Sequence, residues 1–170
     1  NNPILTNGGS INILAENTVD TTVTIVGGIQ SDYSDYSSNY VEVYIDSALD
    51  ATFGGTSIGT VDINVTNSVT NTIDGGAYIY DYYDQSQNYA YLYIANSILT
   101  DFGSVTLTAD NSFTRDVTAG DIDYLYDYSS NYAYIESQGA PIYSISGDVR
   151  ILATNTVDNS TMAIDGSISY

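Results

Sequence analysis

Three aspartates recur at matching places in the chain and could bind a cation together. Asp35, Asp84 and Asp127 each open a short motif of the form Asp-x-Ser-x-Asn-Tyr. If these motifs stack on one another, the carboxylates lie about 5 Å apart, where like charges repel. Ca²⁺ prefers oxygen ligands and would relieve that repulsion. The motif therefore predicts a calcium site, with a solvated acidic loop as the alternative, since no known calcium-loop pattern accompanies it.

The chain offers few side chains for catalysis. It contains no His, Cys or Lys, which removes the usual pairs of nucleophile and base. Paired carboxylates, as in glycoside hydrolysis, are what remains. The two basic residues, Arg115 and Arg150, occupy unrelated positions in the repeat described below. We therefore expect no catalytic residues and no enzyme activity.

Eighteen tyrosines form a second candidate surface, in clusters at 33–44, 78–93 and 124–134. Alternate residues of a strand share one face, so stacked copies of these segments would form aromatic ladders that favour strand pairing. The residues predicted for the ladder are Tyr40, Tyr89, Tyr91, Tyr93, Tyr132 and Tyr134. Such a face predicts packing or lateral association. Glycan binding is the alternative, because tyrosine rings also stack on sugars.

Composition limits the partners and the location of the protein. With 21 acidic residues against two basic ones, the net charge is −19, which repels nucleic acid and anionic membrane surfaces and attracts cations. No apolar run approaches the roughly 18 residues of a membrane helix, so we expect no membrane embedding. The first residue, Asn1, is typical of a chain that has lost a signal peptide. The expected location is secreted, extracellular or at the cell surface.

An internal repeat relates these residues to one another. Four segments share an alternating apolar pattern that ends in Asn followed by Ser or Thr, and their asparagines are Asn17, Asn67, Asn111 and Asn155. The aspartate motif recurs in the same register, which makes chance similarity a poor explanation. The chain is then one domain, 1–170, with repeats 10–59, 60–103 and 104–147 and partial repeats 1–9 and 148–170.

The repeat predicts an all-β fold. Each unit reads as strands with period-two alternation joined by polar and glycine-rich turns, and no segment has helical periodicity. A β-solenoid or a stack of β-arches built from repeats of about 44 residues is one arrangement; an antiparallel β-sandwich is the alternative. The aligned asparagines favour the stack, since amide ladders form only when equivalent residues lie in register.

Both ends of the chain look like parts of a repeat. Residues 2–10 match 96–104 without gaps, and 148–170 match the first half of a unit. Uncapped strand edges are templates for another chain, and a head-to-tail contact of this kind grows without limit unless it closes. The residues predicted for this assembly interface are Asn2, Ile4, Leu5, Ile164, Ile168 and Tyr170. Closure of both ends onto one monomer is the alternative.

In-register β-repeats, aromatic and asparagine ladders and an acidic, cysteine-free surface resemble those of self-assembling extracellular β-proteins of bacteria and archaea. These include β-solenoid fibre subunits and amyloid-like sheath proteins of filamentous methanogens. The resemblance is general, covers the whole chain and transfers no functional residue; the chain lacks the Gln- and Asn-spaced repeat of curli-type subunits. We expect a structural subunit that forms a homopolymer in a fibre, sheath or surface layer. A surface adhesin that binds glycans is the second hypothesis.

Overall fold

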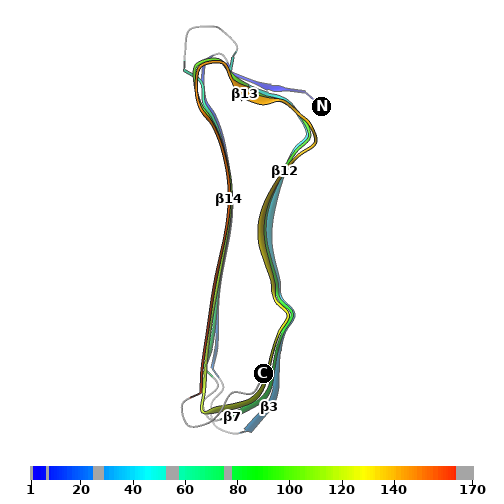
Figure 1. Cartoon of the computed structure of the whole chain (residues 1–170), viewed down its shortest axis with the longest axis vertical. Helices are drawn as coiled ribbons and strands as arrows, with labels where there is room; N and C mark the ends of the chain where they lie inside the picture. Colours follow the sequence, from blue (N-terminus) through cyan, green and yellow to red (C-terminus); the bar gives the residue numbers. More distant parts are fainter. Residues whose placement is uncertain (1, 7, 25–28, 53–57, 75–77, 164–170) are drawn as a thin grey trace.

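The structure is a computed structural model that describes residues 2–6, 8–24, 29–52, 58–74 and 78–163, and all regular structure in these ranges is β-strand. The strands form four parallel sheets, each named here for its place in Figure 1 or its content. The long sheet contains β2 (Ile11–Thr24), β6 (Val61–Asp74), β10 (Val105–Ala119) and β14 (Val149–Ala163). The tyrosine sheet contains β4 (Ser38–Ile45), β8 (Gln87–Ile94) and β12 (Ser130–Ser137).

Two smaller sheets connect these two at their ends. The bottom sheet contains β3 (Ile29–Asp35), β7 (Tyr78–Asp84) and β11 (Asp121–Asp127). The top sheet contains β1 (Ile4–Leu5), β5 (Leu49–Asp50), β9 (Ile98–Thr100) and β13 (Ile142–Ser144). One pass through the long, bottom, tyrosine and top sheets is called a rung below. Three rungs are complete, β1 precedes the first, and β14 follows the third.

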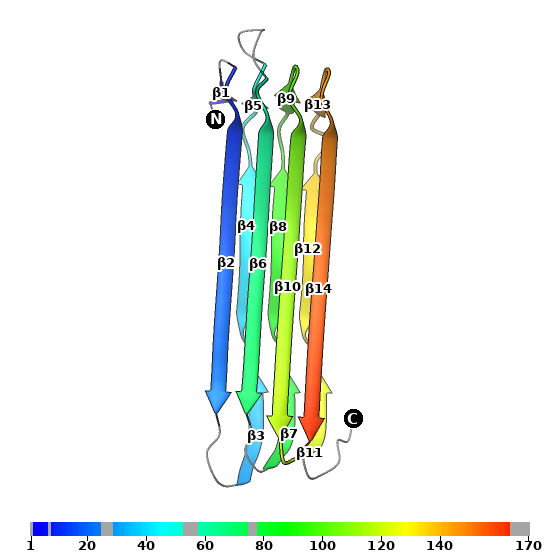
Figure 2. The same cartoon turned by 90° about the vertical axis from the view of Figure 1, so that its left-hand side faces the viewer.

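The strands pair in the register of the sequence repeat. In the long sheet, Asn17 lies opposite Asn67, Asn67 opposite Asn111, and Asn111 opposite Asn155. All strand ladders among the described residues are parallel, which is consistent with stacked repeats. Figure 2 shows the four strands of the long sheet side by side in one direction, with the tyrosine sheet running the opposite way behind them.

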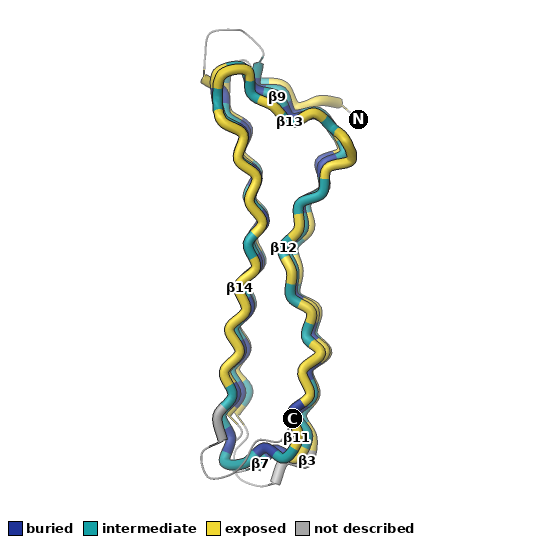
Figure 3. The backbone as a smooth tube through the Cα atoms, in the orientation of Figure 1, coloured by how far each residue is buried: buried dark blue, intermediate teal, exposed yellow. Residues whose placement is uncertain are grey.

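Residue alternation explains how the long and tyrosine sheets enclose an interior. In β6 every second side chain, from Val61 to Ile73, is buried, and the residues between them are polar and point outward. In β8, Ala90, Leu92 and Ile94 are buried while the intervening tyrosines are partly exposed. This is the period-two pattern of strands with one face against a core. Figure 3 shows the two sheets facing each other, with the foremost strand, β14, largely exposed.

Two apolar clusters fill this interior. The larger lies between the long, tyrosine and top sheets and includes Ile63, Leu92 and Leu107. The smaller lies beside the bottom sheet and includes Ile73, Tyr82 and Val117. Along β6 and β10 the clusters are separated by polar residues that point inward, and these residues build the candidate site.

The turn from the top sheet into the long sheet requires glycine. Gly9, Gly59, Gly103 and Gly147 occupy equivalent places, and a Cβ atom on Gly103 or Gly147 would collide with the backbone of the preceding glycine. The strands therefore approach at the turn more closely than any side chain allows. No helix in the described part of the chain is long and apolar enough to span a membrane.

Candidate functional site

The three predicted aspartates lie at the corner where the bottom sheet meets the tyrosine sheet. Asp35, Asp84 and Asp127 end β3, β7 and β11 and pair with one another in register. In each rung the aspartate Oδ1 accepts a hydrogen bond from the backbone N–H two residues later, at 2.8, 2.7 and 2.9 Å. This is an Asx turn, in which a short carboxylate side chain fixes the bend of its own backbone. The aspartates thus shape the corner of every complete rung.

The same corner carries an amide ladder that the sequence interpretation missed. Asn39, Asn88 and Asn131 each donate a hydrogen bond to the serine hydroxyl of their own motif. They also bond to one another, with Nδ2 of Asn39 donating to Asn88 at 3.1 Å and Nδ2 of Asn88 donating to Asn131 at 3.0 Å. The recurrence of Asn at the fifth motif position was the signal that could have revealed this ladder.

The predicted asparagine ladder in the long sheet also forms. Nδ2 of Asn17 donates to Asn67, Asn67 to Asn111, and Asn111 to Asn155, at 2.7, 2.8 and 2.8 Å. Nδ2 of Asn67 donates a further bond across the interior to the carbonyl of Asn39 at 3.1 Å. This contact ties the long sheet to the tyrosine sheet.

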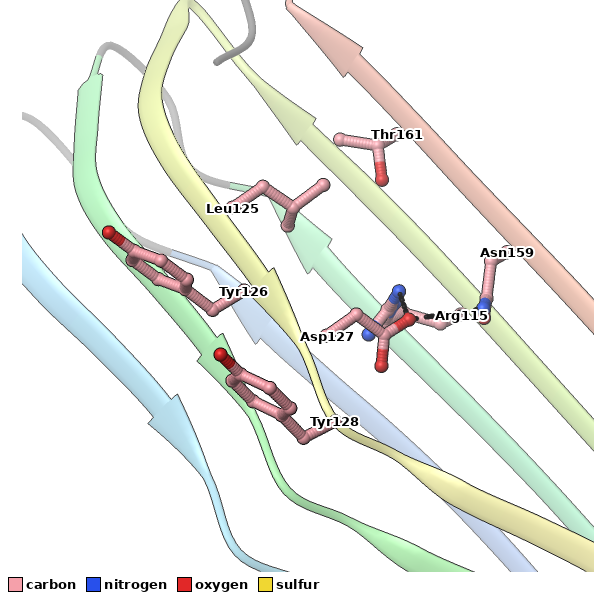
Figure 4. A pocket seen from close by; sticks show the side chains of 7 residues that line it. All are labelled: Arg115, Leu125, Tyr126, Asp127, Tyr128, Asn159 and Thr161. Carbon is pink, nitrogen blue, oxygen red and sulfur yellow. Dashed lines mark hydrogen bonds and ion pairs between the residues drawn. The ribbon is translucent and has the colours of Figure 1, made fainter. Parts of the chain in front are cut away.

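Arg115 separates two of the three aspartates. It extends from β10 across the interior, and its two terminal nitrogens contact Asp84 and Asp127, each at 2.6 Å (Figure 4 draws the Asp127 contact). The Arg115 and Asp84 side chains are almost fully buried, whereas Asp127 is 30% exposed. The guanidinium also lies 5.5 Å from the centre of the Tyr82 ring. A buried cation between two carboxylates therefore neutralises part of the charge of the aspartate column, the stack of Asp35, Asp84 and Asp127.

Arg115 belongs to a column of the long sheet that faces the aspartates. Its register partners are Asn71 in β6 and Asn159 in β14, and Asn71 pairs with Thr21 in β2. Asn71 donates to Oδ2 of Asp35 at 3.1 Å, and Asn159 to Oδ2 of Asp127 at 3.4 Å. Each aspartate thus has a donor on the opposite sheet. The sequence interpretation missed this role of Arg115 because it compared repeat positions without knowing which strands face each other.

The ion pairs shift the protonation of their members. Burial alone would raise the pKa of Asp127, but hydrogen bonds from Arg115 and Ser129 and the arginine charge hold it below its usual range. Burial alone would lower the pKa of Arg115, but Asp127, Tyr82 and Asp84 raise it. The site therefore keeps both partners charged.

These contacts bear on the calcium prediction. The carboxylates meet protein donors at both oxygens, and Arg115 stands at the place between Asp84 and Asp127 where the prediction put a cation. In the described ranges no group of three or more His, Cys, Asp or Glu side chains could hold a metal ion. Calcium binding at Asp35, Asp84 and Asp127 stays a prediction that no observation tests.

The column opens at one end of the stack. An open cavity of about 550 Å³ lies beside Arg115, Asp127 and Asn159, and Leu125, Tyr126, Tyr128 and Thr161 complete its lining (Figure 4). The exposed side of the Asp127 carboxylate faces this end, whereas Asp84, one rung earlier, is covered. The same column is thus closed inside the stack and accessible at its last complete rung.

The six tyrosines predicted for the ladder lie on the outer face of the tyrosine sheet. Tyr40, Tyr89 and Tyr132 stack in one column, with ring centres 4.9 and 4.7 Å apart and planes within 4° and 3°. Tyr91 and Tyr134 stack at 5.7 Å and 11°. Tyr93 is tilted against the rings of Tyr44 and Tyr91, and the third rung has Glu136 in its column.

Two glutamates accept hydrogen bonds from this face. The hydroxyl of Tyr89 donates to Glu42 at 2.9 Å, and that of Tyr91 donates to Glu136 at 2.8 Å. Burial and these hydrogen bonds raise the pKa of both tyrosines. Both faces of the Tyr89 ring are covered by the rings of Tyr40 and Tyr132, which themselves remain about half exposed.

The predicted assembly residues fall into two groups. Asn2, Ile4 and Leu5 are exposed at the N-terminal end of the stack, where β1 pairs with β5 on one side. Ile164, Ile168 and Tyr170 lie outside the described residues.

No family model, curated protein or solved structure matches this chain. Inferences about function therefore depend on the residues and geometry described above.

Proposed function

We propose that the chain is a structural subunit with a β-solenoid fold that associates end to end with copies of itself in an extracellular fibre, sheath or surface layer. The observation that carries this proposal is the exposure of β14. Val149, Ile151 and Val157 are 43%, 53% and 43% exposed, while their register partners in β10, Val105, Leu107 and Phe113, are fully buried. One further strand would bury these side chains as β14 buries those of β10.

From Val149 to Thr161, the inward face of β14 carries none of the charges or prolines that block strand addition, and its pairing with β10 has no bulge. Exposed strand edges commonly carry inward-pointing charges, prolines or bulges. The inward side chains of β14 are apolar or uncharged, and include Ile151, Asn155 and Asn159. Covering an exposed Val or Ile is worth on the order of 1 kcal/mol for the fraction of its surface removed from water. Three such residues and a row of main-chain bonds favour the addition of a strand.

The other end of the stack is complementary in polarity. Every bond of the long-sheet amide ladder runs from the Nδ2 of one rung to the Oδ1 of the next, so the ladder begins at Asn17 and ends at Asn155. A second copy placed with its β2 on β14 would continue the ladder from Asn155 to its own Asn17. The same placement brings its β1, with Ile4 and Leu5, onto β13.

This joint has one consequence on the opposite side. In the joined copies, β14 and the β1 of the second copy belong to one rung, which separates the third rung of the first copy from the first complete rung of the second. In the tyrosine sheet, β12 and the β4 of the second copy therefore lie two strand spacings apart, about 9.6 Å. The described residues contribute no strand to the tyrosine sheet in this intervening rung. The long and top sheets would therefore hold the joint together.

A charge on the inward side of β14 tests the proposal. Ile151→Lys places an ammonium group in the new interface, whereas Leu152→Lys puts the same group on the outer face of the same strand. We expect the parent chain and Leu152→Lys to form elongated particles in sedimentation and negative-stain microscopy, and Ile151→Lys to remain monomeric. A parent chain that is monomeric at all concentrations, or equal behaviour of the two variants, contradicts the proposal.

Two further parts of the proposal rest on composition. A chain without His, Cys or Lys, and with an acidic surface, suits a non-enzymatic role outside the cell. The glycan-binding alternative has less support at the middle of the column of Tyr40, Tyr89 and Tyr132, since the outer two rings cover both faces of the Tyr89 ring, where a sugar would need a free face.

A further inference from the structure

We propose that the column of Tyr40, Tyr89 and Tyr132 is a site of oxidative cross-linking, in which Tyr89 forms a dityrosine bond with the tyrosine of an adjacent rung. The oxidant is of the peroxidase class, an enzyme that uses hydrogen peroxide to remove single electrons from phenols. The product would join consecutive rungs covalently, in a chain that has no cysteine for disulfides.

The geometry of the column supplies the first requirement, a close pair of rings. The three rings are nearly coplanar in pairs, with centres under 5 Å apart, and their Cα atoms are paired in register on neighbouring strands. Tyr40 and Tyr132 are 50% and 44% exposed as residues, so an oxidant can reach the column from solvent. Two radicals formed here are held next to each other by the sheet and do not need to diffuse.

Glu42 supplies the second requirement, an acceptor for the phenolic proton. A tyrosine that loses an electron becomes strongly acidic and must release its proton as the neutral phenoxyl radical forms. The Tyr89 hydroxyl already donates to the Glu42 carboxylate at 2.9 Å, within the distance for direct proton transfer. Oxidation of Tyr89 therefore needs no rearrangement of the side chains.

The chemistry balances with one peroxide for each cross-link. Tyr89 and one neighbour each lose one electron to the oxidant and one phenolic proton, which for Tyr89 passes to Glu42 and on to solvent. The two radicals combine through a carbon–carbon bond between the ring carbons next to the oxygens. The hydrogens on those two carbons then move to the oxygens and restore both phenols. The two electrons and two protons reduce hydrogen peroxide to two waters.

A second tyrosine cluster provides a matched control. Tyr83, on the bottom sheet, has three ring neighbours, Tyr36, Tyr126 and Tyr128, at 5.5 to 6.2 Å, but all are tilted by 48° to 55°. Its hydroxyl accepts a hydrogen bond from Gln85 at 2.6 Å, whereas that of Tyr89 donates to a carboxylate. Both sites thus place several tyrosine rings close together, but they differ in ring stacking and in the proton acceptor.

The test oxidises dilute protein with peroxidase and hydrogen peroxide and follows dityrosine fluorescence. We expect single chains lighter by two hydrogens, and a cross-linked peptide that contains Tyr89 after digestion at acidic residues. Tyr89→Phe keeps the ring stack and should abolish this peptide and most of the fluorescence, while Tyr83→Phe should leave both unchanged. Glu42→Gln should slow the formation of the Tyr89 cross-link, because an amide does not accept the proton.

Several results would overturn the proposal. Equal losses of dityrosine fluorescence in Tyr89→Phe and Tyr83→Phe would show that the closeness of several rings alone decides the reaction. Products that join only separate chains would contradict coupling between rungs, and a Glu42→Gln variant with an unchanged rate would remove Glu42 as the proton acceptor. Because single-chain products are measured, the result does not depend on end-to-end association.

Discussion

The column of Asn17, Asn67, Asn111 and Asn155 and the column of Asp35, Asp84 and Asp127 both stack identical polar residues along the same axis. In the asparagine column each side chain bonds to the next copy of itself, at 2.7 to 2.8 Å. In the aspartate column no such bond is possible. Each carboxylate bonds to the backbone of its own turn and to a donor on the long sheet.

The difference follows from the hydrogen-bonding groups of the two side chains. A primary amide carries both a donor and an acceptor, so identical amides stacked at the strand spacing satisfy one another. An ionised carboxylate only accepts, and identical copies repel. The residues that face the aspartates are therefore not identical: the column contains Thr21, Asn71, Arg115 and Asn159. A carboxylate can thus recur in a stacked repeat when the opposite sheet supplies a donor to each copy.

Removal of the arginine should have the largest effect. Arg115→Met keeps most of the side-chain volume but leaves the fully buried Asp84 carboxylate without its cation. Breaking a buried ion pair from one side typically costs 3–5 kcal/mol, so we expect the free energy of unfolding to fall by about that amount. Chemical denaturation followed by circular dichroism measures this change.

Arg150 gives the matched control for this prediction. It lies one strand away, in β14, on the exposed outer face of the long sheet. Arg150→Met should change the free energy of unfolding by about 0.5 kcal/mol or less. The double variant Arg115→Met with Asp84→Asn removes the buried charge and should recover much of the lost stability. A loss as large in the double variant as in Arg115→Met would show that packing, and not charge, accounts for the effect.

Replacing one amide of the asparagine column with a carboxylate should have an intermediate effect on the free energy of unfolding. Asn111→Asp places a carboxylate in the middle of the amide ladder, where it still accepts from Asn67 but no longer donates to Asn155. Asn111 is fully buried, so the lost donor and the unpaired charge should cost about 2–3 kcal/mol. The same denaturation measurement applies. Asn155→Asp, at the exposed end of the ladder, should cost about 1 kcal/mol or less, and equal losses at the two positions would refute the ladder as the cause.

The asparagine column could be predicted from sequence because its partners are copies of itself. The spacing of Asn17, Asn67, Asn111 and Asn155 contains the register, and the alternation around each places it on the inner face. The same reasoning placed Tyr40, Tyr89 and Tyr132 in one column. Tyr93 was also predicted for the ladder, but Glu136 occupies its column in the third rung, and the Tyr93 ring is tilted against that of Tyr44.

The partners of the aspartates could not be predicted in this way. Arg115 lies 31 residues from Asp84 along the chain, and their contact depends on which rung of the long sheet faces which corner. The alignment of repeats compares equivalent positions within one sheet and contains no information on contacts across the interior. The calcium prediction likewise considered the charge of the aspartates without the opposite strand, and no observation tests it.

The smallest of the three effects should be a pH dependence of the free energy of unfolding that comes from the aspartate column and not from the asparagine column. Asp127 has a pKa below its ordinary value in the folded chain, so its carboxylate stabilises the fold at neutral pH, and this contribution is lost as the pH falls through the folded pKa, below about 4. Amides do not titrate, so the asparagine ladder adds nothing to this dependence.

We expect the difference in unfolding free energy between the parent chain and Asp127→Asn to shrink as the pH is lowered through this range. In an Arg115→Met background the same difference should vary less with pH, because hydrogen bonds from Arg115 and the arginine charge lower that pKa. A difference that is independent of pH in the parent background would contradict the pairing of Asp127 with Arg115 in solution.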